Sequence, residues 1–312
     1  MSKVLITGGA GFIGSHLAKS LVNDGHEVVV IDNLSMGEEK NLSGLNVEFL
    51  EHDVTDKEFM HRILRKYKFD YIYFLAAVAS VADSIARPLE THAVNQEIVL
   101  DTLEFIRHNN LLLKRFIFTS SAAVYGDSPI TPKREDTSVQ PLTPYAVDKY
   151  ASERFTINYE KLHGVPTVAV RFFNVFGPNQ NPKSPYSGVL SIITDKLKNG
   201  ETFTLYGDGM QTRDFIYIDD VIEALRLVAI KTSKSTVYNV ANGKETSLLD
   251  IIRLYEKVTG KKLKIDQQPT RNGDISKSVA DITKIRKLGF KSNWSLEEGL
   301  KKYWQHETKK GA

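Results

Sequence analysis

Short apolar segments alternate with longer amphipathic segments over the first two-thirds of the chain. The apolar segments are hydrophobic at nearly every position, which predicts strands that are buried on both faces. These predicted strands cover residues 3–9, 27–33, 47–53, 70–77, 115–121 and 167–174. Predicted helices lie between them at residues 12–25, 55–67, 90–109 and 145–163. Strands and helices in this order indicate an α/β fold with a Rossmann-type, doubly wound parallel sheet.

The pattern changes near residue 175. Prolines and glycines among polar residues predict a long loop over residues 177–188. Beyond it, helices are predicted at residues 188–199, 219–231, 247–259 and 295–307, and strands at residues 202–207 and 237–242. We therefore predict one domain over residues 1–175 and a smaller, interleaved C-terminal α/β region over residues 176–312. Segments around residues 213–242 are expected to return to the first domain.

The composition of the chain mainly excludes certain kinds of partner and binding site. The 41 basic and 38 acidic side chains are intermixed, and the formal charge of +3 predicts neither nucleic acid nor a membrane surface as a partner. The chain has no cysteine, which excludes disulfides and thiolate metal sites, and the spacing of its eight histidines predicts no metal site. No apolar run approaches the ~20 residues of a membrane helix. The N-terminal residues show no signal-peptide pattern, so a cytoplasmic location is expected.

The stretch GGAGFIG joins the first predicted strand to the first predicted helix. Gly8, Gly11 and Gly14 allow a tight turn and a close approach of the backbone to a pyrophosphate, whose charge the free N–H groups of the helix stabilise. Phe12 and Ile13 belong to the same predicted contact surface. A glycine pattern that follows a strand and opens a helix indicates a dinucleotide site.

Asp32 ends the second predicted strand, 18 residues after Gly14. A carboxylate there can accept hydrogen bonds from the adenosine ribose, together with the neighbouring Asn33, and it repels a 2′-phosphate. No arginine follows in NLSMGEEK, so the predicted cofactor is NAD rather than NADP. Asp53, with Val54, ends the third predicted strand, where it either contacts the adenine amine or, as the stronger alternative, stabilises a turn.

Tyr145 and Lys149 lie one helical turn apart, which on its own fits any surface helix. In a chain that binds NAD, the pair predicts an acid–base group. Lowering the pKa of tyrosine from ~10 to 7 requires roughly 4 kcal/mol, and an ammonium at ~4 Å in an effective dielectric of ~20 supplies roughly that amount. We therefore expect Lys149 to lower the pKa of Tyr145. The tyrosinate then takes the proton of a secondary alcohol while hydride leaves for the nicotinamide. Ser120 or Ser121 would supply a third, hydroxyl group.

These segments resemble the extended short-chain dehydrogenases/reductases that act on nucleotide sugars. The resemblance spans essentially the whole chain and rests on GGAGFIG, SSAAVYG, Tyr-x-x-x-Lys, RFFNVFGPNQ and GDGMQTRDFIYIDDV in the family's order. It implies that Ser121, not Ser120, is catalytic, and that the first domain binds NAD while the second region binds the substrate. It also implies cofactor-side positions at Ala76, Ala77, Asn95 and Phe172, where Asn95 is a structural asparagine and Phe172 packs beside the nicotinamide.

The same resemblance implies a UDP-sugar substrate. It assigns the diphosphate and ribose to Asn174, Arg213, Arg271 and Asp274, and the uracil to the strand that carries Thr204 and Tyr206. Further substrate contacts fall on Ala79, Ser80, Ser121, Tyr145, Gly188 and Val189. Ala79 departs from some UDP-galactose 4-epimerases, which have a lysine there and belong to a different subgroup.

The residues after Ser121 narrow the expected reaction. Sugar 4,6-dehydratases of the family carry an Asp–Glu pair there and UDP-glucuronate decarboxylases usually a Glu, whereas this chain has Ala122 and Ala123, which transfer no proton. What remains is oxidation at carbon 4, rotation of the keto-sugar and hydride return, as in a UDP-hexose 4-epimerase. The alternatives are a UDP-glucuronate 4-epimerase, a reductase with net NAD(H) turnover, and an inactive NAD-binding regulator. The last of these would not need to keep Ser121, Tyr145 and Lys149 intact.

Ser278 matches a late position that lines the sugar pocket in this family. A serine leaves room for an acetamido group, which favours UDP-GlcNAc/UDP-GalNAc and also allows UDP-Glc/UDP-Gal. The structural alternative is that Ser278 only ends a strand. The resemblance further implies a homodimer through the helices at residues 90–109 and 145–163, the second of which carries Phe155, Ile157 and Tyr159.

Overall fold

The central sheet has seven parallel strands in the order β11-β6-β5-β4-β1-β2-β3. The computed structural model describes residues 1–180, 188–270 and 276–309. The strands are β1 (Lys3–Thr7), β2 (Glu27–Asp32), β3 (Val47–Glu51), β4 (Tyr71–Phe74), β5 (Arg115–Ser121), β6 (Thr167–Phe172) and β11 (Val237–Val240). This is the Rossmann strand order with one strand added beyond β6, so the predicted fold class is confirmed.

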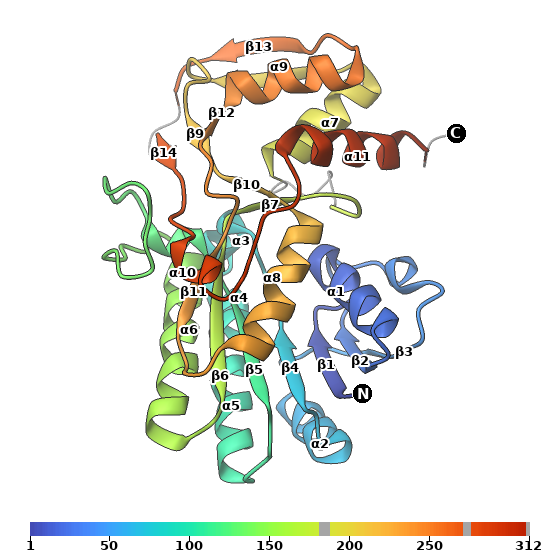
Figure 1. Cartoon of the computed structure of the whole chain (residues 1–312), viewed down its shortest axis with the longest axis vertical. Helices are drawn as coiled ribbons and strands as arrows, with labels where there is room; N and C mark the ends of the chain where they lie inside the picture. The colour runs from blue at the N-terminus through green and yellow to red at the C-terminus, as the bar shows by residue number, and fades with distance from the viewer. Residues whose placement is uncertain (181–187, 271–275, 310–312) are drawn as a thin grey trace.

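Helices cover both faces of the sheet (Figure 1). The helices α1 (Phe12–Asn23) and α8 (Ile218–Lys231) pack on one face, and α2 (Lys57–Tyr67), α5 (Ile98–His108) and α6 (Pro144–His163) pack on the other. Alternate residues of each strand enter different cores: Val4 and Ile6 join the cluster on the α1 side, while Leu5 joins the cluster on the α2 side. This sorting explains why the strands are apolar at successive positions.

The C-terminal region lies beyond one end of the sheet (Figure 1). It contains α7 (Val189–Asn199), β8 (Thr202–Tyr206), α9 (Leu248–Thr259), β13 (Lys264–Gln268) and α11 (Leu296–Lys309). The pairing of β13 with β8 is parallel and was not predicted, because all five residues of β13 are exposed and show no apolar alternation.

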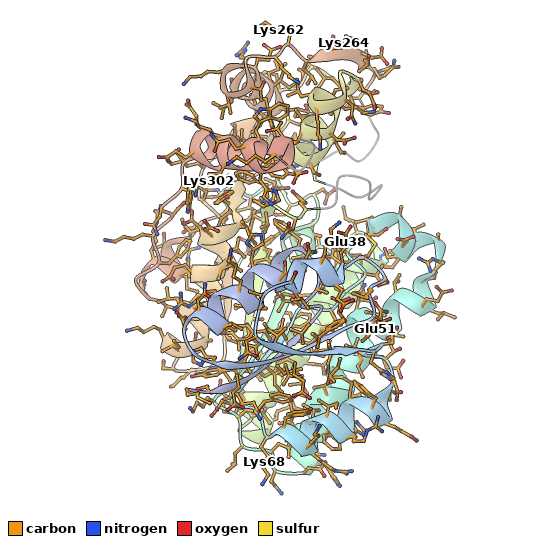
Figure 2. The ribbon with its side chains drawn as sticks, turned by 90° about the vertical axis from the view of Figure 1, so that its right-hand side faces the viewer. Glu38, Glu51, Lys68, Lys262, Lys264 and Lys302 are labelled. Carbon is orange, nitrogen blue, oxygen red and sulfur yellow. The ribbon has the colours of Figure 1, made fainter. Side chains whose placement is uncertain are left out.

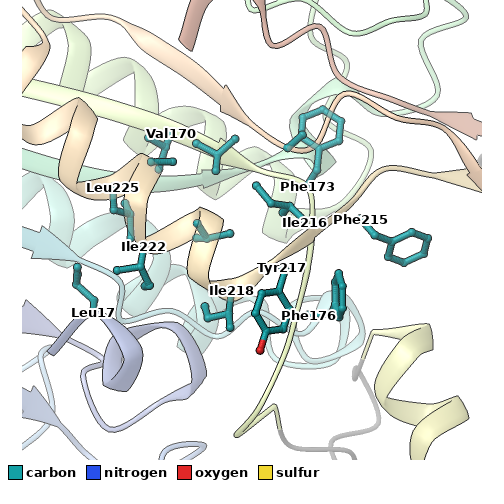
Figure 3. Packing of buried hydrophobic residues seen from close by; sticks show 14 of the residues in the cluster. Leu17, Val170, Phe173, Phe176, Phe215, Ile216, Tyr217, Ile218, Ile222 and Leu225 are labelled. Carbon is teal, nitrogen blue, oxygen red and sulfur yellow. The ribbon is translucent and has the colours of Figure 1, made fainter. Parts of the chain in front are cut away.

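Short strands connect this region to the main sheet. β7 (Asn174–Phe176) pairs in parallel with β10 (Phe215–Tyr217), and β9 (Thr212–Arg213) pairs with β12 (Thr246–Ser247) and β14 (Lys277–Ser278). Figure 3 shows the aromatic side chains of this junction continuing the core of α8. After the junction, α8 packs on the main sheet and β11 pairs with β6 at its edge. The domain boundary at residue 175 stays a prediction.

The helix predicted at residues 90–109 is divided into three parts. They are α4 (Pro88–His92), a π-helical turn (Ala93–Glu97) and α5. The remaining elements are α3 (Val81–Ala86), α10 (Thr283–Arg286) and 3₁₀ turns at Glu39–Leu42 and Ala122–Tyr125. A π-helical turn inside a helix is often found next to a functional site.

The surface carries charged side chains of both signs. Figure 2 shows Glu38 and Glu51 on the sheet half of the molecule, Lys68 at its lower end, and Lys262 and Lys264 at the opposite end. Within the described ranges, no helix is both long and apolar enough to span a membrane.

One expectation about the surface is wrong. Ile157 and Tyr159 are only 5% and 6% exposed, because they pack in the core between α6 and the sheet. Phe155 alone of the three proposed interface residues stays exposed.

Candidate active site

The site lies where the strand order reverses, between β1 and β4. Ligands of such sheets bind in the crevice at the carboxyl ends of the strands beside this point. The glycine loop follows β1, the segment that begins at Leu75 follows β4, Ser121 ends β5 and Phe172 ends β6. Parallel pairing places these strand ends along one edge of the sheet.

The glycine loop has no space for side chains at two of its positions. A Cβ atom on Gly8, whose φ is +71°, would lie 2.8 Å from the backbone nitrogen of Ala76, and a Cβ on Gly14 would lie 2.2 Å from the carbonyl oxygen of Gly8. Helix α1 then starts with Gly11 at its N-cap, with no side-chain cap and no acidic residue in its first turn. Its free N–H groups therefore suit a dinucleotide pyrophosphate.

Asp32 holds this loop in place. Its carboxylate accepts the backbone N–H groups of Ala10 and Leu34, each at 2.9 Å. Because each carboxylate oxygen has a second acceptor position, Asp32 keeps capacity for ribose hydroxyls. The residues present thus fit an NAD molecule at this edge.

The surroundings of Asp53 fit the alternative in which it stabilises a turn. It accepts hydrogen bonds from the amide and hydroxyl of Thr55 at 2.8 and 2.7 Å, and from the amide of Asn33 at 2.7 Å. Burial raises the pKa of Asp53, but these hydrogen bonds outweigh it and lower the pKa overall. Val54 is buried in the core beside it. Asp53 therefore stabilises the turn and orients Asn33.

Ser121, Tyr145 and Lys149 meet between β5 and α6. Thr143 caps α6 by accepting the N–H of Ala146 at 3.2 Å, so that Tyr145 lies in the first turn and Lys149 in the second. The side chain of Ser121 is close enough to Tyr145 to act on its pKa. The Lys149 ammonium donates to the carbonyl of Thr119 at 2.9 Å. Strand alternation turns Ser120 to the other face, which supports the choice of Ser121.

The electrostatics differ from the expectation. Burial raises the pKa of Tyr145, and the hydrogen bond with Ser121 opposes this rise only in part. Burial also lowers the pKa of Lys149 to about 7, against the attraction of Asp148. In the protein without NAD, the pKa of Tyr145 is therefore raised rather than lowered, because the expectation left out the desolvation of both groups.

Asn95 organises the segment after β4. Its side-chain oxygen accepts the N–H of Val78 at 2.9 Å and its amide donates to the Val78 carbonyl at 3.1 Å. Its own carbonyl accepts the hydroxyl of Ser152 in α6 at 2.9 Å. Asn95 thus joins the segment that carries Ala76, Ala77, Ala79 and Ser80 to the helix that carries Tyr145. Ser80 is buried as the N-cap of α3, whereas Ala79 is exposed.

The proposed substrate residues lie on the short strands and on α7. Ser278 pairs with Arg213 across β14 and β9, and the amide of Asn174 donates to the Asp214 carbonyl at 2.9 Å. Thr204 and Tyr206 share one face of β8, opposite the buried Phe203 and Leu205. Gly188 is the N-cap of α7 and Val189 is its first residue. Arg271 and Asp274 lie outside the described residues.

Two buried groups were missed by sequence reasoning. Glu153 and Arg171 form an ion pair at 2.6 Å with 1% and 3% of their side chains exposed. Asp214 is 0% exposed and accepts several backbone N–H groups. Their positions in the sequence could have pointed to them, because Glu153 lies one helical turn after Lys149 and Asp214 directly follows Arg213.

Together, the Rossmann sheet, the glycine loop and the position of Asp32 define a dinucleotide-binding protein. Residues 4–241 match the model of the NAD dependent epimerase/dehydratase family. The chain therefore belongs to this family, and its cofactor is NAD.

Relatives with assigned names match along nearly the whole chain. The UDP-glucose 4-epimerase of Mycolicibacterium smegmatis is 34% identical over 307 residues, which is 96% of each chain. Among solved structures, the UDP-glucose 4-epimerase of Thermotoga maritima with UDP-glucose has a TM-score of 0.94 and 35% identity, covering 99% of this chain and 100% of that one. The UDP-N-acetylglucosamine 4-epimerase of Methanobrevibacter ruminantium M1 with UDP-N-acetylmuramic acid has a TM-score of 0.93 and 36% identity, covering 99% of each chain.

Proposed function

We propose that the protein interconverts the carbon-4 epimers of a UDP-hexose, with UDP-GlcNAc/UDP-GalNAc as the favoured pair and UDP-Glc/UDP-Gal also accepted. One observation carries this proposal: the side chain of Ser121 is close enough to Tyr145 to act on its pKa, and the residues that follow Ser121 are Ala122 and Ala123. The site therefore has the groups for alcohol oxidation but lacks the acid–base pair that elimination of water requires. Relatives named as 4-epimerases of both kinds of sugar support it.

The proposed roles follow from the positions of the three side chains. In its ionised form, Tyr145 accepts the proton of the sugar 4-hydroxyl, and Ser121 orients that sugar hydroxyl. The NAD that the glycine loop and Asp32 would hold would supply the hydride acceptor and donor for carbon 4, and its positive ring would favour the tyrosinate. Lys149, fixed by the Thr119 carbonyl, holds its proton beside Tyr145 and the cofactor ribose. After the keto-sugar rotates, hydride would return to the opposite face of carbon 4, and Tyr145 would return the proton to the oxygen on that carbon.

The diphosphate is assigned to the junction strands. Arg213 supplies a fixed positive charge and a planar set of donors, which suits phosphate oxygens. Asn174 lies at the start of β7, and Phe215 of β10 pairs with it directly. The free N–H groups at the start of α7, beside Gly188 and Val189, are a further anion-binding element.

The preference for N-acetylated sugars rests on Ser278. It is half-buried and lies directly across from Arg213, which places a small side chain next to the proposed diphosphate site. The fact that Ser278 also ends β14 is compatible with this role.

We also propose a homodimer through α5 and α6. Val147, Phe155 and Leu162 of α6 are 49%, 36% and 71% exposed, and their spacing places them on one face of the helix. An exposed apolar face of this kind is typical of a subunit contact.

The test is to incubate the protein with NAD⁺ and either UDP-GlcNAc or UDP-Glc, and to resolve the products by anion-exchange chromatography or proton NMR. We expect UDP-GalNAc to form without net NADH. Conversion of UDP-Glc alone would support the 4-epimerase activity but reject the preference for N-acetylated sugars. Net formation of NADH would indicate a dehydrogenase. If folded, NAD-bound protein converted neither substrate, both sugars would be rejected and UDP-glucuronate would be the remaining candidate substrate.

A further inference from the structure

Asp214 is a buried carboxylate that the proposed chemistry does not use. It lies between β9 and β10, at the joint where the chain passes from the three-stranded sheet to the two-stranded one. Its side chain is 0% exposed. A buried carboxylate is stable only with several hydrogen bonds, so its partners show what it holds.

The carboxylate of Asp214 binds two segments that are distant in the sequence. It accepts the backbone N–H groups of Asn242 at 2.9 Å and Gly243 at 3.0 Å. These residues follow β11 of the main sheet. It also accepts the N–H of Ala280 at 3.2 Å, two residues after Ser278.

The backbone of Asp214 holds a third segment. Its carbonyl oxygen accepts both the backbone N–H of Asn174 at 3.1 Å and the side-chain amide of Asn174 at 2.9 Å. Arg213 precedes Asp214 directly and pairs with Ser278. One residue therefore connects Asn174, Arg213 and Ser278, which come from β7, β9 and β14, to the end of β11.

We propose that Asp214 is a positioning residue that sets the UDP-sugar site by holding Asn174, Arg213 and Ser278 in register with the main sheet. The proposal rests on the proposed function of these three residues. An asparagine cannot replace the aspartate, because the N–H groups of Asn242, Gly243 and Ala280 converge on both carboxylate oxygens, and an amide nitrogen would face at least one donor with another donor.

The effect should fall on substrate binding rather than on chemistry. None of the hydrogen bonds of Asp214 reaches β5 or α6, which carry Ser121, Tyr145 and Lys149. A change that shifts only the substrate segments raises KM and leaves kcat nearly unchanged, whereas a general loss of structure lowers kcat and NAD content together.

The experiment compares Asp214→Asn with a matched control, Asp220→Asn. Asp220 is also a buried carboxylate, 1% exposed, and accepts the backbone N–H groups of Asn293 at 2.9 Å and Trp294 at 3.2 Å. Among the described residues, its side-chain hydrogen bonds go to residues 292–294 and to none of the three substrate residues. The measurements are made at pH 8, because burial raises the pKa of Asp214 to about 6 and the carboxylate is ionised there.

For Asp214→Asn we expect KM for the UDP-sugar and Kd for UDP to rise by roughly tenfold or more, the loss that follows when buried partners are left unpaired. We expect kcat to stay within about twofold and NAD content to stay at the wild-type level. Asp220→Asn should lower the melting temperature but change neither KM nor Kd. Equal KM effects in both variants, or unchanged UDP binding in Asp214→Asn, would overturn the proposal.

A second measurement needs no variant and covers the case in which Asp214→Asn does not fold. In the wild-type holoenzyme, UDP should slow hydrogen exchange of the amides of Asn242, Gly243 and Ala280 and leave those of Asn293 and Trp294 unchanged. Exchange at the first three that does not respond to bound UDP would overturn the proposal. Titration calorimetry with UDP separates this result from the proposed function, since UDP binding is measured even if neither sugar is converted.

Discussion

Glu153 and Arg171 form a buried ion pair at 2.6 Å that joins the helix of Lys149 to the strand of Phe172. Arg171 donates to both oxygens of Glu153, and its guanidinium lies 4.7 Å from the ring centroid of Tyr125, just after Ser121. The pair therefore connects α6, β6 and the 3₁₀ turn Ala122–Tyr125, which follows Ser121 directly. Its geometry is bidentate, the arrangement in which arginine and carboxylate groups interact most specifically.

We expect Glu153→Gln to destabilise the protein by about 3–5 kcal/mol, because it leaves the charge of Arg171 buried without a partner. Chemical denaturation measures this change. The double variant Glu153→Gln, Arg171→Met is the control, since it removes both charges and should recover a large part of the loss. A double variant that is less stable than Glu153→Gln would contradict this account.

Ser121→Ala should lower kcat by roughly 10²–10⁴-fold, the range for losing a group that takes part in proton transfer. Its matched control is Ser120→Ala on the neighbouring residue. Ser120 is 3% exposed and its hydroxyl has no hydrogen-bond partner among the described residues, so its removal should leave activity and stability almost unchanged. Equal losses in the two variants would show that the strand end, not the hydroxyl of Ser121, is required.

The burial of Lys149 predicts a pH-dependent stability. Its pKa is lowered from 10.5 to about 7 in the folded protein, so between these values the unfolded chain holds a proton that the folded chain has released. Stability from this group therefore rises with pH across that window, and the cost of burying the charge is fully present below pH 7.

We accordingly expect Lys149→Met to be inactive but more stable than the wild type at pH 6, when both are measured without NAD. The advantage should shrink by up to about 4 kcal/mol by pH 10, where wild-type Lys149 is neutral in the folded state. Urea denaturation at pH 6, 8 and 10 gives the difference. A stability difference that does not vary with pH would mean that Lys149 keeps its charge when buried.

Ser278→Tyr should decrease kcat/KM for UDP-GlcNAc by about 10²-fold while changing UDP-Glc by only a few-fold, because a bulky side chain excludes the acetamido group. Lys277→Tyr, on the exposed side of the same strand, is the matched control and should affect neither substrate. Parallel losses for both sugars in Ser278→Tyr would show that this side chain does not line the acetamido pocket.

Local features of the sequence were enough to predict the fold class and much of the proposed active site. Buried strands of a parallel sheet are apolar at successive positions, and the helices between them have a different period, so the alternation is visible in the chain itself. The glycine loop, Asp32 and the Tyr145–Lys149 pair depend on strand ends and on one helical turn, which are also local. Their predicted positions agree with β1, β2 and α6.

Contacts between distant segments were decided only by the tertiary structure. Strand β13 is exposed along its length and forms because β8 lies beside it, and β9 and β14 have two residues each, too few to show a period. In the sequence, Asp214 cannot be distinguished from any other loop aspartate. Its role depends on residues 242–244 and 280, which lie beside it only in the folded chain. The same reason explains the pKa values of Tyr145 and Lys149: helical spacing placed the two side chains close together, but only packing determined how much water each one lost.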